Sequence, residues 1–187
     1  MPQKFQPIEL FIKTMISPET DLQVLPLHNY PQYLEACCEM INEEWPRSKT
    51  ARMISLTASC DELPTSLILI NKKLQLLGHA KLTCLPNIPN SCFVETVVIA
   101  KHMRGRKLGT FLMKEVEYYC KRILKLQMLH LSTKGQEEFY RKLGYEVCPP
   151  VSIYACSHLS LGSFQNFVTE LRSDEVKFFN YFKMSIE

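Results

Sequence analysis

A strand, a glycine-containing turn and a helix follow one another between residues 93 and 124, and this order constrains the fold more than any other stretch. The run FVETVVIA (93–100) is rich in Val and Ile, which favour a buried strand. RGRKLGT (104–110) supplies two glycines and three cations. The segment 107–124 then places apolar residues on one face at helical spacing. These residues are Leu108, Leu112, Val116, Cys120 and Ile123.

The following residues predict a second strand, parallel to the first. LQMLHLST (126–133) has the composition of a strand, and GQEEFYRKL (135–143) that of a short helix. Gly144 is a natural helix stop before YEVC. Parallel neighbours need a long crossover connection, and the predicted helix over 107–124 provides one.

The first half of the chain predicts a strand, a helix and then a hairpin. LQVLPLH (22–28) indicates a strand, and PQYLEACCEMINEEW (31–45) indicates a helix that ends near Trp45. SLILIN (66–71) and LQLLGHAKLTCL (74–85) indicate two antiparallel strands, with Gly78 marking a bulge.

Two connections in this half are expected to be loops. PRSKTARM (46–53) is short and cationic, and it holds no acid. PNIPNS (86–91) has the composition of a turn.

The fold class follows from these elements. We expect a mixed α/β domain with a twisted, mostly antiparallel sheet, a central parallel strand pair and helices on both faces. Residues 1–187 show no internal repeat and no Pro- or Gly-rich linker, which predicts a single domain with its core at about 22–148. Residues 1–20 are expected to form an arm or an edge strand. Residues 149–187 are expected to hold a strand, in VSIYAC, and an aromatic tail, FFNYFKM.

Composition excludes several classes of protein. Hydrophobic residues make up 46% of the chain and charged residues 22%, which is ordinary for a globular protein. A net charge of +3 is too small to predict nucleic-acid binding. No apolar run is long enough for a membrane span. We therefore expect a protein that binds neither nucleic acid nor a membrane. A monomer is also expected.

The cysteines indicate a reducing compartment. They are scattered, form no CxxC pair and follow no signal peptide, which predicts free thiols in a cytosolic protein. No Cys or His cluster has zinc-ligand spacing, so no metal is expected. The eight cysteines are Cys37, Cys38, Cys60, Cys84, Cys92, Cys120, Cys148 and Cys156.

The turn RGRKLGT has the character of an anion site. A strand that enters a helix through a glycine turn points backbone N–H groups and the positive end of the helix dipole at one spot, which suits a phosphate. The stretch lacks both the GxxxxGK[ST] and the GxGxxG patterns, which disfavours nucleoside triphosphate and nicotinamide binding.

At this point the chain resembles the GNAT superfamily of N-acetyltransferases. Their acetyl-CoA signature is Arg or Gln-x-x-Gly-x-Gly or Ala; Arg104 matches its first position and Gly109 its last, while Lys107 stands where the central glycine is usual. FYRKLGY resembles the closing motif of that superfamily, an aromatic pair followed by Gly and an aromatic. Within the superfamily, MINEEWPRSKTAR, FVETVVIAKHMRGRKLG and LHLSTKGQEEFYRKLGYE are most similar to the actin N-terminal acetyltransferases.

This resemblance implies acetyl-CoA as co-substrate and direct acetyl transfer to an amine. Backbone N–H groups and cations of the turn would hold the pyrophosphate. A backbone N–H of Val97 or Val98 would stabilise the oxyanion, and the pantetheine arm would pair with the strand as far as Ile99. The turn residues so assigned are Arg104, Gly105, Arg106, Lys107, Leu108, Gly109 and Thr110.

The resemblance also implies the proton donor. Tyr140 stands at the usual position of the general acid, which protonates the departing thiolate and touches the coenzyme. The attacking α-amine has a pKa near about 8, so a weak or water-relayed base suffices. Glu95, His130 and His79 are the candidates for that base, in this order.

The substrate implied is the processed, acidic N terminus of actin, and profilin-bound actin is a further partner, although the chain has no proline-rich run to engage profilin. Cations on loops would surround an acidic peptide, and Trp45 would wall its groove. The substrate-binding candidates are Trp45, Arg47, Lys49, Arg52, His79, Thr96, Thr133 and Lys134. Two alternatives remain open: a small-molecule amine acetyltransferase, and a non-catalytic acyl-CoA-binding module.

Overall fold

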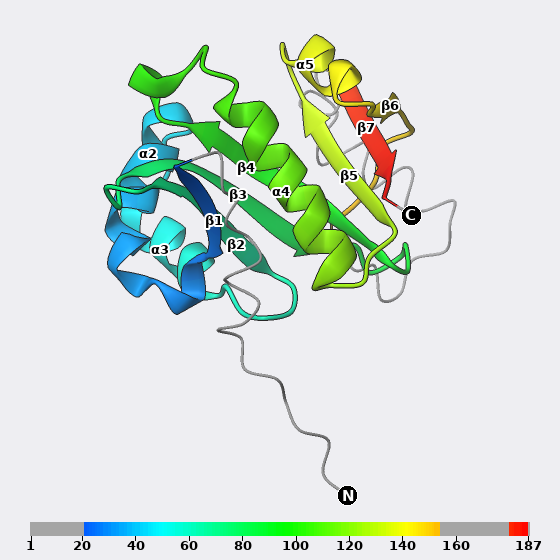
Figure 1. Ribbon diagram of the computed structural model, residues 1–187. Coiled ribbons are helices and arrows are strands. Elements are labelled where there is room, and N and C mark those ends of the chain that lie inside the picture. Colours follow the sequence, from blue (N-terminus) through cyan, green and yellow to red (C-terminus); the bar gives the residue numbers. More distant parts are fainter. Residues whose placement is uncertain (1–20, 154–179, 187) are drawn as a thin grey trace, which may run out of the picture.

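A single seven-stranded sheet organises the computed structural model, which describes residues 21–153 and 180–186 (Figure 1). The strand order is β1-β2-β3-β4-β5-β7-β6, and β4 and β5 are the parallel neighbours in an otherwise antiparallel sheet. The strands are β1 (Leu22–Pro26), β2 (Thr65–Asn71), β3 (Leu76–Cys84), β4 (Ser91–Ile99), β5 (Met128–Thr133), β6 (Glu146–Val147) and β7 (Asn180–Ser185). The predicted mixed sheet with a central parallel pair is confirmed.

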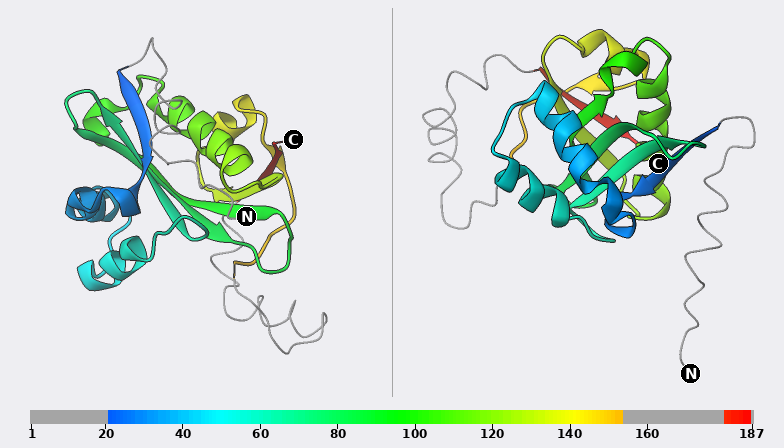
Figure 2. Two further views of the ribbon diagram at one scale, coloured as in Figure 1. Left: turned by 60° about the horizontal axis from the view of Figure 1, so that its bottom comes forward. Right: turned by 90° about the vertical axis from the view of Figure 1, so that its left-hand side faces the viewer.

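Helices cover both faces of the sheet (Figure 2). On one face, α2 and α3 enclose a core that includes Ile41, Leu56 and Ile68; on the other, α4 encloses the larger core, centred on residues such as Leu112 and Leu129. The helices are α2 (Leu34–Glu44), α3 (Lys49–Thr57), α4 (Leu108–Arg122) and α5 (Glu137–Lys142), with 3-10 turns at Leu27–Asn29, Pro31–Tyr33 and Lys101–Met103.

Helix α3 contradicts the predicted loop at 46–53. Ser48 caps the helix by accepting a hydrogen bond from the Ala51 N–H at 3.5 Å. The residues of α3 that turn inward are Arg52 and Leu56. Because one of these inward positions holds an arginine, the stretch shows no apolar period and looks like a solvated loop.

The other predicted elements hold within a few residues. A bulge lies directly beside Gly78, where Leu69 pairs with Gly78 but Ile70 pairs with Leu76. The aromatic segment FFNYFKM was expected to be a tail, but its part from Asn180 onward belongs to β7, which lies between β5 and β6. The arm at 1–20 and most of VSIYAC lie outside the described residues.

The parallel pair is short, and this creates an opening in the sheet. β4 pairs with β5 only from Ser91 to Val94. Beyond Val94, β4 carries an extra residue relative to β3, and Thr96 within this bulge has a positive φ of 51°. β4 therefore bends away, and Figure 1 shows β4 and β5 diverging toward the end where α4 begins.

Gly78 allows β3 to lie close to the bent end of β4. A Cβ at this position would lie 2.6 Å from Ile99 Cδ1 and 2.9 Å from the Val98 carbonyl oxygen. The second contact is with backbone, so it cannot be relieved by a rotamer change. A side chain here would displace the strand that carries Val97–Ile99.

Gly78→Ala should therefore destabilise the fold by about 1 to 3 kcal/mol, measured by urea unfolding. Gly109→Ala is the matched control, since its Cβ would lie 3.4 Å from the nearest atom, Phe139 Cζ. In a helix, that change should leave the free energy of unfolding the same or raise it by up to about 1 kcal/mol. Equal effects of the two substitutions would refute the close approach at Gly78.

Candidate active site

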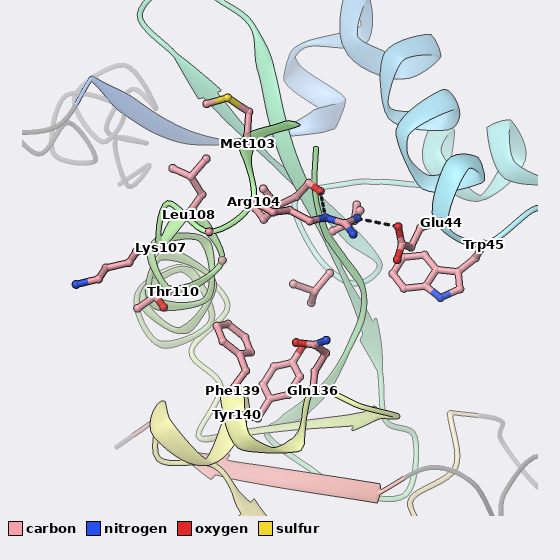
Figure 3. Close-up of a pocket in the computed structure, with 15 residues that line it drawn as sticks. Glu44, Trp45, Met103, Arg104, Lys107, Leu108, Thr110, Gln136, Phe139 and Tyr140 are labelled. Carbon is pink, nitrogen blue, oxygen red and sulfur yellow. Dashed lines mark hydrogen bonds and ion pairs between the residues drawn. The ribbon is translucent and has the colours of Figure 1, made fainter. Parts of the chain in front are cut away.

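The opening between β4 and β5 contains a cavity of about 500 Å³ (Figure 3). The bent end of β4 forms one wall, the turn into α4 another, and the start of α5 a third, while the end of α2 lies across from α5. The lining residues are Glu44, Trp45, Val97, Val98, Ile99, Met103, Arg104, Gly105, Lys107, Leu108, Gly109, Thr110, Gln136, Phe139 and Tyr140. The structure thus brings the predicted coenzyme residues together, apart from Arg106.

The turn into α4 has the backbone that an anion site needs. Lys107 is the N-cap in the left-handed conformation, with φ 60° and ψ 12°, so this lysine adopts the geometry that a glycine usually supplies. The Phe111 N–H donates to the Lys107 carbonyl at 3.1 Å. The N–H groups of residues 108–110 precede that first helical hydrogen bond and remain available to a ligand.

Gly109 keeps the cavity open beside this turn. A Cβ there would meet the Phe139 ring and approach Ile99 Cγ1 at 4.0 Å, so a larger side chain would fill the space between α4 and the strand. The Lys107 ammonium points away from the cavity (Figure 3). The turn into α4 therefore fits a pyrophosphate held by backbone N–H groups. The space that Gly109 leaves between α4 and β4 fits an extended chain beside it.

The side chain of Arg104 braces the site. Its Nε donates to the Ile99 carbonyl oxygen at 3.0 Å, and its Nη2 pairs with Glu44 Oε2 at 2.7 Å (Figure 3). A second link joins Lys101 to Glu43 at 3.9 Å. The end of α2 is thereby tied to the turn after β4.

Tyr140 lies in an aromatic cluster on the floor of the cavity. The centroid of its ring lies 5.0 Å from that of Phe139 and 5.7 Å from that of Tyr145, and both contacts are edge-on. The ring centroid of Phe182 in β7 lies 6.4 Å away. Burial raises the pKa of Tyr140 to about 12. The phenol therefore stays protonated at neutral pH, and its O–H can donate to a ligand in the cavity.

The three candidate bases lie outside the cavity lining. Glu95 accepts a hydrogen bond from Thr83 and pairs with Lys81 at 3.4 Å. His130 Nδ1 lies 3.9 Å from Cys148 Sγ, and burial together with the charge of Lys183 lowers the pKa of this histidine.

His79 is fully buried. Its Nδ1 lies 3.3 Å from the Thr96 carbonyl oxygen, and its Nε2 has no partner among the described residues. Burial lowers the pKa of His79 to about 4, so the ring is neutral at cellular pH.

The predicted substrate cations occupy different environments. Arg52 is buried; its guanidinium donates to the Trp45 carbonyl at 2.8 Å and to Asn42 Oδ1 at 3.1 Å. Burial and the nearby charge of Arg47 lower the pKa of Arg52. Lys49 pairs with Glu35 at 2.7 Å on the exposed side of α3.

The remaining substrate candidates lie at the two strand ends. Thr96 occupies the bulge of β4, with its hydroxyl buried and without a partner among the described residues. Thr133 is buried at the end of β5, and Lys134 follows it on the surface. Neither Thr96 nor Thr133 lines the cavity.

Sequence reasoning missed four lining residues: Glu44, Met103, Gln136 and Phe139. Phe139 stands next to Tyr140 in the aromatic pair of FYRKLGY. Gln136 precedes Tyr140 by four residues, which is about one helical turn. Their positions relative to Tyr140 could therefore have identified both residues. Glu44 joins the site through Arg104, which lies 60 residues away in sequence, and no local pattern indicates that contact.

Comparison with known proteins agrees with this geometry. Residues 65–147 match the sequence model of a family described as an acetyltransferase (GNAT) domain, and the chain carries a GNAT acetyltransferase domain. Enzymes of this family use acetyl-CoA. Over 139 residues, 71% of this chain, the sequence is 37% identical to N-alpha-acetyltransferase 80 of mouse (Mus musculus). The alignment covers 44% of that relative, so the chain spans less than half its length.

Solved structures share the fold at low sequence identity. An acetyltransferase of the GNAT family from Staphylococcus aureus superposes with a TM-score of 0.63 and 15% identity, covering 89% of this chain and 99% of that one. A spermidine N-acetyltransferase from Vibrio cholerae, solved with CoA and spermine, gives a TM-score of 0.63 at 14% identity, covering 88% and 95%. Within residues 21–153 and 180–186, no helix has the length and apolarity needed to cross a membrane.

The left-handed backbone at Lys107 yields a prediction about this turn. Lys107→Gly and Lys107→Ala both remove the charge, but only alanine retains the steric cost of positive φ. The glycine variant should therefore be more stable than the alanine variant by about 1 kcal/mol in urea unfolding. Because the ammonium points away from the cavity, both variants should bind CoA alike by calorimetry. A more stable alanine variant would contradict the conformation described here.

Proposed function

We propose that this protein is an acetyl-CoA-dependent N-terminal acetyltransferase whose substrate is the processed, acidic N terminus of actin. The observation that supports it most is the cavity, where an unpaired strand edge, a helix N-terminus and a buried phenol meet. The likeness to a mouse N-alpha-acetyltransferase supports an α-amine as the acceptor.

The geometry of the cavity walls supports a place for the coenzyme. The N–H groups of residues 108–110 would bind the pyrophosphate. Ala100 N–H donates to the Leu77 carbonyl on β3 at 2.9 Å, and N–H directions alternate along a strand, so the Ile99 N–H faces the opening. The amide groups of pantetheine would pair with this edge as an added strand does.

Transfer requires three things of the chain. Acetyl-CoA supplies an activated acetyl thioester, and the amine nitrogen bonds to its carbonyl carbon. A backbone N–H at Val97 or Val98 would stabilise the negative charge that develops on the carbonyl oxygen. Tyr140 would donate its proton to the sulfur as the carbon–sulfur bond breaks, and Glu95 acting through water would accept the proton released by the amine.

Charge at the corner between α2 and α3 favours an acidic substrate. Arg47 and Arg52 lie close enough for one charge to lower the pKa of the other, and Trp45 beside them lines the cavity. The Arg47 side chain has no ion-pair partner among the described residues. The carboxylates of Glu43, Glu44 and Glu95 are each paired with a cation.

A polyamine acetyltransferase is the second candidate, because a spermidine N-acetyltransferase shares the fold. A polycationic amine needs free carboxylates around its path. Since Glu43, Glu44 and Glu95 are already paired with cations, the local charge favours an anionic peptide over a polyamine.

Tyr140→Phe tests the role of the phenol. It removes one hydroxyl from a packed ring and should lower kcat by about 10- to 100-fold. The dissociation constant for acetyl-CoA should stay nearly unchanged, because the aromatic packing remains. Phe139→Leu is the control for packing alone and should act mainly through KM. An unchanged kcat in Tyr140→Phe would exclude the phenol as the acid.

Transfer of labelled acetyl to a panel of acceptors tests the substrate class. Peptides beginning with Asp or Glu should be acetylated in preference to peptides beginning with Met or Ser and to spermidine. Arg47→Glu should raise KM for the acidic peptides selectively, by about tenfold. Arg122→Glu, at the far end of α4, is the matched charge reversal and should have no effect. Preference for spermidine would favour the polyamine reading, and CoA binding without any transfer would favour a non-catalytic module.

A further inference from the structure

The buried histidine of β3 contacts the backbone of the bulge that bends β4 away from β5. His79 Nδ1 lies 3.3 Å from the carbonyl oxygen of Thr96, which has positive φ in the bulge of β4. A carbonyl oxygen only accepts hydrogen bonds, so Nδ1 carries the hydrogen and the ring is the Nδ1–H tautomer. Thr96 is β-branched and is strained in the left-handed region, so the bulge needs an external contact to hold it.

The contact lies on the face of the sheet that α2 and α3 cover. The cross-strand neighbours of His79 are Ile68 and Val98, and both belong to the core beneath α2 and α3. Val97 packs instead toward the core beneath α4, although both valines line the cavity. The peptide unit that joins Thr96 to Val97 therefore has its carbonyl oxygen on the α2 and α3 side, while the Val97 side chain lies on the α4 side.

A planar trans peptide transmits orientation across this unit. The Thr96 carbonyl and the Val97 N–H belong to one rigid plane and point in opposite directions. A donor that holds the carbonyl on the α2 and α3 side consequently aims the N–H toward the α4 side, where Val97 lines the cavity. Rotation of this plane would move the N–H away from a reacting carbonyl oxygen.

We propose that His79 is a positioning residue, which fixes the Thr96–Val97 peptide so that the Val97 N–H is the oxyanion donor. This inference rests on the proposed acetyl transfer for its kinetic consequence, and it selects Val97 over Val98. It also gives His79 a role other than base or substrate ligand. The ring suits the task because it is rigid and has no exposed atom that solvent can hydrogen-bond.

Three variants test this role. His79→Leu keeps most of the buried volume but removes the donor. His79→Asn places an amide N–H near the position of Nδ1. Leu82→Ala is the matched control, because Leu82 is fully buried on the same strand yet belongs to the core beneath α4.

NMR of the labelled, ligand-free protein provides a readout that does not depend on activity. The ¹³C shift of the Thr96 carbonyl and the ¹⁵N shift of Val97 should move in His79→Leu, return toward wild type in His79→Asn, and stay in place in Leu82→Ala. If both shifts are the same in wild type and His79→Leu, the positioning role is wrong, whatever the enzyme assays show.

Kinetics then separate this inference from the proposed function. In an active wild type, His79→Leu should lower kcat about tenfold and leave the dissociation constant for CoA unchanged, with most of kcat restored in His79→Asn. An equal fall in Leu82→Ala, or no rescue by asparagine, would overturn it. A wild type that acetylates no amine would refute the proposed function, and the NMR shifts would still decide the role of His79.

Discussion

The separation of β4 from β5 is the constraint on which the rest of the site depends. Two parallel strands that stayed paired would satisfy each other's backbone groups and leave no room between them. Here the pairing stops at Val94, and the bulge at Thr96 turns β4 away. The result is a strand edge with unpaired N–H groups inside the domain, where an extended ligand can pair with it. The turn into α4 and the aromatic floor from α5 can contact such a ligand because they border this opening.

The sequence predicts most of the elements because their signals are local. Val and Ile runs, helical spacing in 107–124 and the glycine at 144 all act within a few residues. Helix α3 escaped prediction because Arg52 takes an inward position that an apolar residue normally occupies, and its charge is satisfied by the carbonyl of Trp45. The bulge escaped prediction because threonine stands where a glycine would have signalled positive φ.

The site shows the same division between local and distant information. RGRKLGT indicated an anion-binding turn, and its residues apart from Arg106 do line the cavity, where Lys107 adopts the left-handed backbone despite its side chain. The environment of Arg104 could not be read, since Glu44 reaches it only after α2 packs beside β4. The same holds for His79, because its contact with the Thr96 carbonyl forms only when β3 and β4 pair. Residue types therefore indicated candidate site residues, while tertiary packing decided which of them line the cavity and which lie behind it.

The position of β7 has a consequence for how the protein is made. β7 lies between β5 and β6, and it supplies the Phe182 ring near Tyr140. A ribosome synthesises β5 and α5 well before it reaches β7, so the nascent chain exposes one edge of β5 and an unfinished aromatic floor during that interval. Chaperones that cover unpaired strands would act on this intermediate. The Tyr140 ring reaches its final packing only when β7 is inserted into the sheet.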